Sequence, residues 1–320
     1  MKNILITLPL NENEKKLFQD KVKDSSEKVN LIFIEETAVS EKDITSADAI
    51  IGMVLPSLLG NAASLEWLQL AWAGADRYVG TGVLPADTIL TSASGAYGIS
   101  VAEHMISLTF ALYSGLNIYS KQQKNHEWKL NQGKKFIYGS NVLVLGIGDI
   151  GGYYAEKMKA LGAHVTGVCR TPKEKADFLD EQYTIDALDG IIGSADIVAL
   201  ALPAGESTYH VIGREQLQKM KSDSVIINAG RGSTIDTSAL TDALKNGTIG
   251  GAGLDVLENE PLSPDSELWD MKNVIITPHA AGKLEDEFNK KRVIALCADN
   301  LYRYVHKEKL LHIVDKNTGY

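Results

Sequence analysis

A glycine-rich run between an apolar strand and a helix constrains this chain more than any other feature. Residues 146–151 read GIGDIG, a G-x-G-x-x-G pattern that follows the apolar run 142–145 and precedes the helix-forming stretch 152–162. In such a unit the first glycine permits a tight turn, the second lets the backbone approach a pyrophosphate, and the third lets helix and strand pack closely. The helix N-terminus offers unpaired N–H groups to the phosphates. We therefore favour a dinucleotide site here over a purely structural turn.

Short apolar runs alternate with helix-forming segments on both sides of this motif, which is typical of parallel sheets built from β–α–β units. We expect strands at 3–8, 31–34, 49–52, 68–72 and 89–91, a second series at 142–147, 164–169, 197–202, 225–229, 250–256 and 274–279, and long helices at 100–123 and 285–305. This pattern predicts an α/β fold with two doubly wound parallel-sheet domains, Rossmann-like or flavodoxin-like, and a cleft between them. Because the final helix can return to the first series, we expect a discontinuous domain, 1–99 plus 284–320, and a dinucleotide-binding domain, 100–283.

Length, charge and cysteine content restrict the class of protein. The 320 residues suffice for about two domains. The formal net charge of −9 disfavours nucleic acid and anionic membranes as partners, and the two cysteines, Cys169 and Cys297, fit a reducing compartment. The most apolar stretch, 104–119, is interrupted by polar residues and is shorter than the roughly 20 residues of a membrane span. We read it as a buried or subunit-contacting helix and expect a cytoplasmic protein.

Side chains that can bind an anion and move a proton follow predicted strands in the last third of the chain. Arg231 stands between two glycines, which favours close approach of a ligand, and its guanidinium can hold a carboxylate through two parallel hydrogen bonds. His279 can give a proton to a carbonyl oxygen. A glutamate can orient this imidazole and favour its charged form. Glu258 and Glu260 lie in the same acidic loop, and spacing does not choose between them.

The second strand of the dinucleotide unit bears on cofactor choice. An acidic residue that binds the adenosine ribose is expected about 20 residues beyond the glycine motif. Here the strand ends in Cys169-Arg170-Thr171, without a carboxylate. Arg170 can pair with a 2′-phosphate, and Thr171 can add a hydroxyl. We therefore favour NADP over NAD. The chain contains no H-E-x-x-H metal motif, no G-x-S-x-G elbow and no Walker phosphate loop, so we expect no metal ion.

Several runs in order along the chain resemble the D-isomer-specific 2-hydroxyacid dehydrogenases, especially the glyoxylate/hydroxypyruvate reductase-like and phosphoglycerate-dehydrogenase-like members. They are LEWLQLAWAGADRY (65–78), VAEH (101–104), VLGIGDIG (144–151), ADIVALALP (195–203), NAGRGSTID (228–236), LDVLENEPL (254–262) and TPHAAG (277–282). The resemblance implies that Arg231 binds the substrate carboxylate, that His279 is the acid/base and that Glu260 is its partner. It also implies a substrate-binding outer domain and a homodimer built around the helix that contains 101–120.

The resemblance extends to the ligand contacts. It implies that backbone N–H groups around Ala73, Gly74 and Ala75 touch the substrate carboxylate, that Asp255 binds the nicotinamide amide, and that Leu202 and Pro203 lie along the cofactor. Adding the residues argued above, we expect cofactor contacts from Gly146, Gly148, Asp149, Ile150, Gly151, Arg170, Thr171, Leu202, Pro203, Thr208, Ala229, Arg231, Asp255, His279 and Gly282. Two departures from the family pattern are the missing acid after the second strand and the missing asparagine in TSASGAYG (91–98).

These expectations predict an NAD(P)H-dependent reductase that converts a small 2-keto acid, such as glyoxylate or hydroxypyruvate, to the D-2-hydroxy acid. The alternative is a dinucleotide-sensing binding protein, similar to corepressors that resemble this family and act without turnover. Substrate consumption would distinguish the two.

Overall fold

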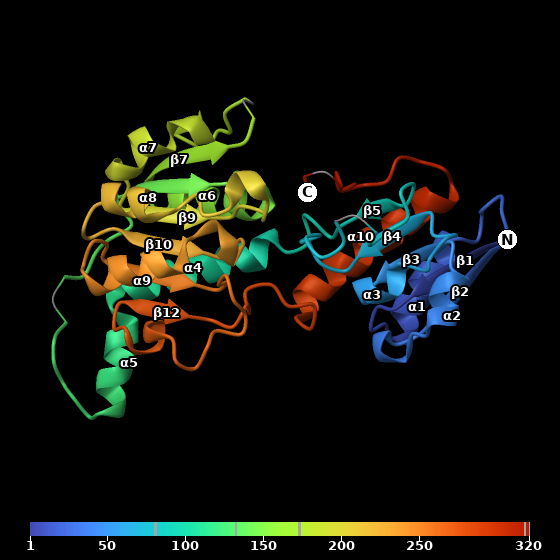
Figure 1. Ribbon diagram of the computed structural model, residues 1–320, viewed down its shortest axis with the longest axis horizontal. Coiled ribbons are helices and arrows are strands. Elements are labelled where there is room, and N and C mark those ends of the chain that lie inside the picture. Colours follow the sequence, from blue (N-terminus) through green and yellow to red (C-terminus); the bar gives the residue numbers. More distant parts are fainter. Residues whose placement is uncertain (80–81, 132, 172–173, 317, 320) are drawn as a thin grey trace. The chain divides into compact units, whose positions relative to one another are not determined.

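The computed structural model describes residues 1–79, 82–131, 133–171, 174–316 and 318–319. The chain divides into two compact units, Met1–Tyr97 with Lys283–Tyr320 and Gly98–Gly282, which are considered separately (Figure 1). We call them the outer unit and the central unit. The sequence-based boundaries, 99/100 and 283/284, lie close to these limits. The roles expected for the two units, substrate binding and cofactor binding, stay predictions.

Five parallel strands form the sheet of the outer unit in the described part of the chain, in the order β2-β1-β3-β4-β5. The strands are β1 (Lys2–Ile6), β2 (Val29–Phe33), β3 (Ala49–Gly52), β4 (Trp67–Leu70) and β5 (Ile89–Thr91). The helices are α1 (Glu12–Lys21), α2 (Glu41–Thr45), α3 (Pro56–Leu59) and α10 (Glu287–Val305), with a 3₁₀ turn at Glu36–Ala38. Every residue of β3 and β4 is buried, as expected for a sheet covered on both faces.

Local capping and helix packing complete the outer unit. Asn11 begins α1 with a capping box, in which its side chain accepts from the Glu14 N–H and the Glu14 carboxylate accepts from the Asn11 N–H. Helix α10 packs against α1, and Lys290 on α10 bonds Glu14 at 3.1 Å. The last helix of the chain therefore belongs with the first strands.

Seven parallel strands form the sheet of the central unit among the described residues, in the order β12-β11-β10-β9-β6-β7-β8. The strands are β6 (Asn141–Leu145), β7 (His164–Cys169), β8 (Glu181–Thr184), β9 (Ile197–Leu200), β10 (Val225–Asn228), β11 (Gly251–Leu254) and β12 (Val274–Ile276). The helices are α4 (Gly98–Ser114), α5 (Leu116–Lys124), α6 (Asp149–Ala160), α7 (Leu188–Ile191), α8 (Arg214–Lys219) and α9 (Thr237–Lys245). The 3₁₀ turns are Ile185–Ala187, Ile192–Ser194, Glu206–Thr208, Gly232–Thr234 and Glu267–Asp270.

The strand order reverses beside β6. Strand β6 pairs with β7 on one side and with β9 on the other. Strands β7 and β8 therefore extend the sheet in one direction from β6, and β9 to β12 extend it in the opposite direction. In open parallel sheets, ligands bind outside the carboxyl ends of the strands at such a switch point. The two-sheet parallel α/β architecture confirms the fold class expected from the sequence.

Two elements differ from the sequence-based expectation. The single helix predicted over 100–123 is two helices, because Gly115 between α4 and α5 adopts the left-handed region with φ 69°. Strand β8 was not predicted, because its sequence EQYT is polar and it lies at the edge of the sheet. An edge strand with exposed side chains lacks the apolar run that marks a buried strand.

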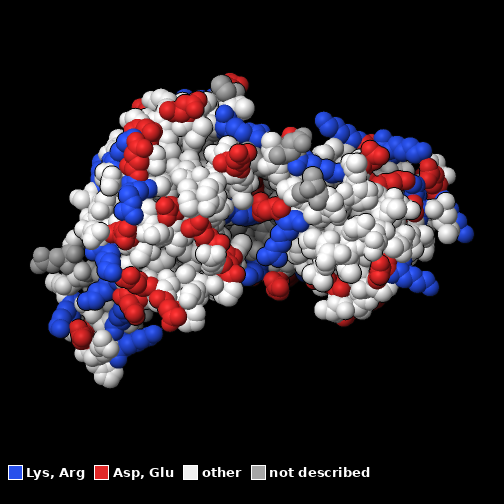
Figure 2. Space-filling view, viewed as in Figure 1, with Lys and Arg blue, Asp and Glu red and all other residues white. Residues whose placement is uncertain are grey.

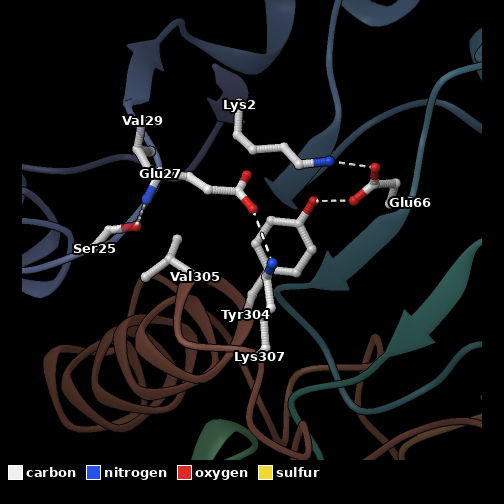
Figure 3. Close-up of a pocket in the computed structure, with 8 residues that line it drawn as sticks. All are labelled: Lys2, Ser25, Glu27, Val29, Glu66, Tyr304, Val305 and Lys307. Atoms are coloured by element: carbon white, nitrogen blue, oxygen red, sulfur yellow. Dashed lines mark hydrogen bonds and ion pairs between the residues drawn. The ribbon is translucent and has the colours of Figure 1, made fainter.

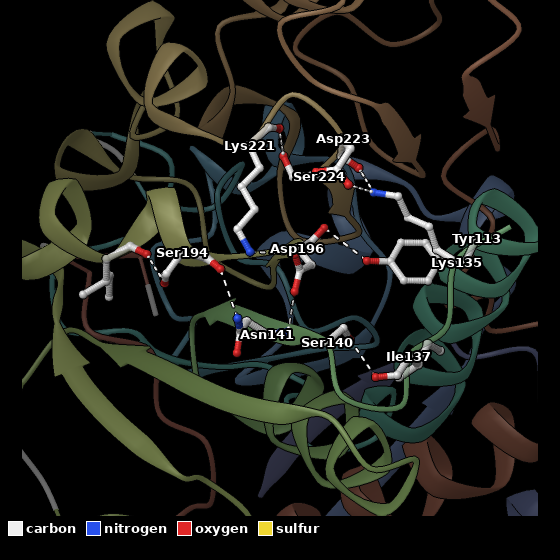
Figure 4. A network of polar contacts seen from close by, with 11 residues as sticks. Tyr113, Lys135, Ile137, Ser140, Asn141, Ser194, Asp196, Lys221, Asp223 and Ser224 are labelled. Carbon is white, nitrogen blue, oxygen red and sulfur yellow. Dashed lines mark hydrogen bonds and ion pairs between the residues drawn. The ribbon is translucent and has the colours of Figure 1, made fainter. Parts of the chain in front are cut away.

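The amino edge of the central sheet is closed by a polar network (Figure 4). The Asp196 carboxylate accepts from the Asn141 N–H at 2.8 Å and from Lys221 Nζ at 2.7 Å, and the Asp196 carbonyl accepts from the Tyr113 hydroxyl. Lys135 pairs with the Asp223 carboxylate at 2.8 Å, which holds the pKa of Asp223 below its usual value. These contacts tie the segment before β6 to the edge opposite the strand carboxyl ends.

The outer unit contains a cavity of about 320 Å³ beside the first residues of β1 and β2, lined by Lys2, Ser25, Glu27, Val29, Glu66, Tyr304, Val305 and Lys307 (Figure 3). Its charges pair with one another. Lys2 bonds Glu66, Tyr304 donates to Glu66 at 2.7 Å, and Lys307 lies 3.0 Å from Glu27. The side chains therefore satisfy each other across the cavity.

The visible surface shows acidic and basic side chains interspersed on both units (Figure 2). Among the described helices, none combines the length and the apolar character that crossing a membrane requires.

Candidate active site

The glycine run joins β6 to α6, and its three glycines meet different surroundings. Gly146 has φ 94°, and a Cβ added there would lie 2.7 Å from the Ala201 carbonyl oxygen. A Cβ on Gly151 would lie 1.8 Å from the Gly146 carbonyl oxygen. At Gly148, the N-cap of α6, an added Cβ would meet no protein atom within 4 Å. Packing therefore requires the first and third glycines, whereas the second leaves open space before the helix N-terminus.

The end of β7 carries the residues expected to select the cofactor. Arg170 and Thr171 follow Cys169 and are both exposed. The Cys169 thiol donates to the Thr171 carbonyl at 3.2 Å, which ties this short segment to the strand end. An exposed guanidinium thus stands at the position where an acidic ribose-binding residue was expected.

A buried asparagine shapes the turn that carries Arg231. Asn228, the last residue of β10, is 1% exposed. Its amide donates to the Arg231 carbonyl at 3.1 Å and accepts from the Gly230 N–H at 3.0 Å. Thr234 donates to the same Arg231 carbonyl at 2.6 Å. The backbone of Arg231 is therefore held from both sides at the carboxyl end of the sheet.

The two glycines beside Arg231 are required by packing within the protein. A Cβ on Gly230 would lie 2.7 Å from the Leu202 carbonyl oxygen, and one on Gly232 would lie 1.9 Å from the Leu257 carbonyl carbon. The two glycines let the Arg231 turn pack between the loops that follow β9 and β11. This packing requirement is a reason for the glycines that the sequence did not give, and the expected close approach of a ligand stays a prediction.

His279 pairs with Glu260. His279 Nδ1 lies 2.9 Å from Glu260 Oε2, and Glu260 Oε1 accepts from the Leu257 N–H at 3.0 Å. The two side chains are 50% and 38% exposed, so solvent reaches the imidazole. Because the carboxylate engages Nδ1, Nε2 is the ring nitrogen left to exchange a proton.

Glu258 has another partner. Its carboxylate lies 2.6 Å from His210 Nε2 and accepts from the Thr237 N–H at 2.8 Å. Burial by itself raises the pKa of Glu258, but these hydrogen bonds outweigh it and hold the pKa below its usual value. The geometry thus pairs Glu260 with His279, a pairing that spacing in the sequence left open.

Asp255 holds the loop that carries His279. The Asp255 carboxylate is buried and accepts from the Thr277 hydroxyl at 2.6 Å, the Ala280 N–H at 2.8 Å and the Ala281 N–H at 3.1 Å. The Asp255 carbonyl accepts from the His279 N–H at 2.8 Å. These contacts fix the backbone of His279, which has φ 50°.

The remaining expected cofactor residues of the central unit follow strand ends. Leu202 and Pro203 follow β9, and the buried Thr208 donates to the Pro203 carbonyl at 2.7 Å. Ala229 follows β10 directly, and Gly282 is the last residue of the unit. Asp149 and Ile150 form the first turn of α6. The carboxyl edge of one sheet therefore carries the glycine run, Arg231, Glu260 and His279.

Comparison with known proteins decides the family. Residues 106–281 match the family described as D-isomer specific 2-hydroxyacid dehydrogenase, NAD binding domain. The chain belongs to this family. It is accordingly an NAD(P)-dependent oxidoreductase of the 2-hydroxyacid dehydrogenase type, and the resemblance inferred from its motifs is confirmed.

Three similar proteins illustrate the match. Glyoxylate/hydroxypyruvate reductase B of Yersinia pestis is 34% identical over 229 residues, which cover 69% of this chain and 67% of that protein. A crystal structure of a D-isomer specific 2-hydroxyacid dehydrogenase family protein from Aeromonas salmonicida has a TM-score of 0.85 at 28% identity and covers 98% of this chain and 99% of its own. An NADPH-dependent glyoxylate/hydroxypyruvate reductase from Sinorhizobium meliloti, solved with NADP and sulfate, has a TM-score of 0.83 at 26% identity over the whole of both chains.

This dehydrogenase holds its site with residues that sequence reasoning missed. They are Asn228 under Arg231, His210 beside Glu258, and His104, whose Nε2 lies 2.9 Å from the Thr277 hydroxyl that bonds Asp255. The sequence does carry a signal for Asn228, because it is a polar residue inside an apolar strand run. His104 and His210 lie far from their partners in sequence, so no local pattern marks them.

The expected substrate loop lies in the outer unit. Ala73, Gly74 and Ala75 follow β4, with Ala73 exposed and Ala75 buried. Their contribution to carboxylate binding stays a prediction. Among the described residues of both units, no group of three or more His, Cys, Asp and Glu side chains is arranged to hold a metal ion.

Proposed function

We propose that this dehydrogenase reduces a small 2-keto acid, such as glyoxylate or hydroxypyruvate, to the D-2-hydroxy acid. The observation that carries the proposal is the His279–Glu260 pair, 2.9 Å apart, at the sheet edge that also carries Arg231 and the glycine run. A carboxylate-bound imidazole is a group that donates and accepts protons near neutral pH. The names of the Yersinia pestis and Sinorhizobium meliloti proteins support the substrate class.

Each of the three residues has a separate task in this proposal. The Arg231 guanidinium binds the substrate carboxylate through two parallel N–H···O bonds and so orients the neighbouring carbonyl. His279 gives the proton from Nε2 to the carbonyl oxygen, and Glu260 orients the ring and stabilises its charged form. Backbone N–H groups of Ala73, Gly74 and Ala75 add donors to the substrate carboxylate.

The central unit has the features that a nicotinamide dinucleotide needs. The open space at Gly148 before the N-terminus of α6 fits a pyrophosphate. Leu202, Pro203, Thr208, Ala229 and Gly282 would contact the cofactor, and Asp255 would bind the nicotinamide amide. When bound, the cofactor supplies the hydride that the substrate carbonyl carbon receives.

We further infer a preference for NADPH over NADH. Arg170 and Thr171 occupy the strand end where a ribose-binding acid would repel a 2′-phosphate, and both are exposed. We expect kcat/KM to be at least about 10-fold higher with NADPH, the order of one charge-assisted contact. Arg170→Ala should reduce the NADPH value and leave the NADH value nearly unchanged. A wild-type enzyme that works better with NADH would refute this preference.

The test of the reaction is the loss of NADPH absorbance with a panel of glyoxylate, hydroxypyruvate, pyruvate and bulkier keto acids. We expect consumption of at least one small 2-keto acid, and the D-isomer of the hydroxy acid by chiral chromatography wherever the product has a stereocentre. If NADPH binds and no keto acid is consumed, the dinucleotide-sensing alternative replaces this proposal. No observation on the chain or its relatives currently favours that alternative.

The proposal includes a homodimer formed through the segment around α4 and α5. Figure 1 shows α5 and the chain after it projecting away from the central sheet. This segment exposes large apolar side chains, namely Leu116, Trp128, Leu130, Phe136 and Tyr138. Exposed apolar side chains concentrated in one segment favour an interface there. Light scattering should give twice the 34.7 kDa chain mass, and the double variant Trp128→Ser, Leu130→Ser should reduce the measured mass.

The net charge and unpaired thiols support a cytoplasmic protein without nucleic-acid partners.

A further inference from the structure

A second histidine–glutamate pair lies next to the proposed catalytic pair. His210 Nε2 and Glu258 Oε1 are 2.6 Å apart, and their side chains are only 30% and 20% exposed. Glu258 also accepts from the N–H of Thr237, the first residue of α9, where the helix dipole favours a negative charge. An exposed ion pair contributes little to stability, but a partly buried carboxylate with two donors is held firmly.

His210 is attached to the loop that carries Arg231. Its N–H donates to the Ser233 carbonyl at 2.9 Å, two residues beyond Arg231. The contact continues along the chain, because the Ile212 N–H donates to the Thr234 carbonyl at 3.1 Å. The imidazole stacks on the Tyr209 ring with centroids 3.9 Å apart. These contacts fix both the backbone and the ring of His210 relative to the Arg231 loop.

Glu258 belongs to the loop that carries Glu260. The Leu257 N–H bonds the Glu260 carboxylate at 3.0 Å, so the backbone beside Glu258 directly positions the partner of His279. The backbone of Glu258 also lies close to Gly232, where an added Cβ would be 2.4 Å from the Glu258 nitrogen. Glu258 therefore stands between the turn that holds Arg231 and the carboxylate that orients His279.

We propose that His210 and Glu258 are positioning residues for keto-acid reduction. Their pair joins the loops after β9, β10 and β11, and it fixes the spacing between Arg231, which binds the carboxylate, and the Glu260–His279 pair, which moves the proton. This inference rests on the proposed function and deepens it. A displacement of about 1 Å between such groups can cost on the order of 100-fold in rate.

The test compares Glu258→Ala and His210→Ala with the wild-type enzyme. We expect kcat/KM for the keto acid to fall about 10- to 100-fold. KM should rise because Arg231 is displaced from the substrate carboxylate, and kcat should fall because His279 is displaced from the carbonyl oxygen. The dissociation constant of NADPH should change much less than kcat/KM, because the glycine run and the end of β7 do not depend on this pair. Glu258→Gln, which keeps an acceptor for Thr237 and a group for His210, should recover part of the loss.

Controls separate a positioning role from general loosening of the fold. His164 also faces two carboxylates, Asp180 at 3.6 Å and Glu181 at 3.7 Å, but it begins β7 at the opposite sheet edge. His164→Ala should leave kcat and KM unchanged. Equal losses in His164→Ala and Glu258→Ala, or a Glu258→Ala variant with wild-type kcat and KM, would overturn the proposal. If the alanine variants do not fold, Glu258→Gln and His210→Asn are compared with His164→Asn in the same way.

A readout without turnover keeps this inference distinct from the proposed reaction. The imidazole signals of the 7 histidines can be followed by NMR, with His279→Gln providing the assignment. Glu258→Ala should shift the His279 signal, because Glu260 loses its fixed position, and His164→Ala should not. An unshifted His279 signal refutes the positioning role even if no keto acid is consumed. A wild-type protein without turnover but with the expected shift refutes only the proposed reaction.

Discussion

His279 is the residue on which the proposed proton transfer depends. Its Nδ1 is engaged by Glu260 at 2.9 Å and its backbone is fixed by Asp255. His279→Gln keeps a hydrogen-bonding group near Glu260 but cannot transfer a proton, so kcat should fall about 100- to 10,000-fold. KM for the keto acid should change little. Steady-state kinetics with His306→Gln, a half-buried histidine directly after α10 in the outer unit, provide the control. Turnover near the wild-type value would exclude His279 as the acid/base.

Arg231 should affect binding more than turnover. Its backbone is held by Asn228 and Thr234, so a change of side chain leaves the turn intact. Arg231→Ala removes a charge-assisted, two-point contact, and KM for the keto acid should rise at least about 10- to 100-fold. Arg231→Lys should recover only part of this loss, because an ammonium group lacks the planar fork. Inhibition by oxalate, measured in parallel, should weaken by a similar factor. An unchanged KM would remove Arg231 from the substrate site.

The sequence predicts Arg231 and His279 as site residues, but it does not give the contacts that hold them. Arg231 and His279 are visible because each follows an apolar strand run and ends up at the carboxyl edge of the sheet. The choice between Glu258 and Glu260 needed the family resemblance, since two glutamates two residues apart are equivalent in spacing. Geometry then gave each glutamate its own histidine, and His210 comes from a loop 48 residues before Glu258. Contacts across such distances leave no local signal.

The glycine run between β6 and α6 permits a sharp test at the scale of elements. Gly151→Ala places a Cβ 1.8 Å from the Gly146 carbonyl, which the strand–helix junction cannot accommodate. We expect a loss of about 2 kcal/mol or more in the free energy of unfolding, typical of an overpacked core. Gly148→Ala meets no protein atom within 4 Å and should leave the melting temperature within a few degrees of wild type.

The same pair of variants separates folding from cofactor binding. Gly148→Ala should fold normally and weaken NADPH at least about 10-fold, because the methyl group fills the space through which the pyrophosphate approaches the backbone. Fluorescence titration gives the dissociation constant, and thermal unfolding gives the stability. A Gly148→Ala variant with normal NADPH affinity would place the pyrophosphate elsewhere.

Elements were predictable where burial dictates the side chains. The run HVTGVC coincides with β7, and β3 and β5 have the expected bounds. The strands expected at 197–202, 225–229, 250–256 and 274–279 end one to three residues beyond the ends of β9, β10, β11 and β12. After β9 the apolar pattern continues past the sheet, whereas after β11 and β12 the extra residues include polar ones that already belong to the loops of the site. Strand β8 is polar and was missed, and the helix over 100–123 is interrupted at Gly115. Periodicity locates a strand, but it does not locate the residue at which the backbone leaves the sheet.

At the scale of the whole molecule, each unit has its own hydrophobic core. One cluster is built on β6, β9, β10 and β11, with members such as Leu145, Leu200 and Ile226, and the other on β1, β3 and β4, with members such as Leu5, Ile50 and Leu68. The alternation of strands and helices predicts two such cores from sequence alone. The discontinuous outer unit followed from the place where the second strand series ends, since a helix beyond it has no strand of that series left to cover.

The two cysteines report on these units separately. Cys297 lies on α10 in the outer unit and is completely buried, which raises the pKa of its thiol to about 12. At pH 8 only about 1 in 10,000 such thiols is the reactive thiolate, and burial also excludes the reagent. Cys169 lies at the end of β7 in the central unit and is half-buried, with hydrogen bonds to two backbone carbonyls. We expect iodoacetamide to modify Cys169 in the native protein and to leave Cys297 unmodified.

Labelling in increasing urea extends this prediction to the unfolding of the outer unit. Cys297 should react only where α10 leaves its unit, so its labelling, followed by peptide mass spectrometry, should track the fluorescence of Trp67. Trp67 is buried against Tyr304 of the same helix, with ring centroids 5.0 Å apart. Labelling should therefore occur in two steps, Cys169 without urea and Cys297 at the urea concentration that unfolds the outer unit. Cys297→Ala should remove only the second step, and Cys169→Ser should remove only the first. Rapid native labelling of Cys297 would mean that α10 opens from the outer unit without unfolding of its core, which would contradict the packing of α10 against α1 and Trp67.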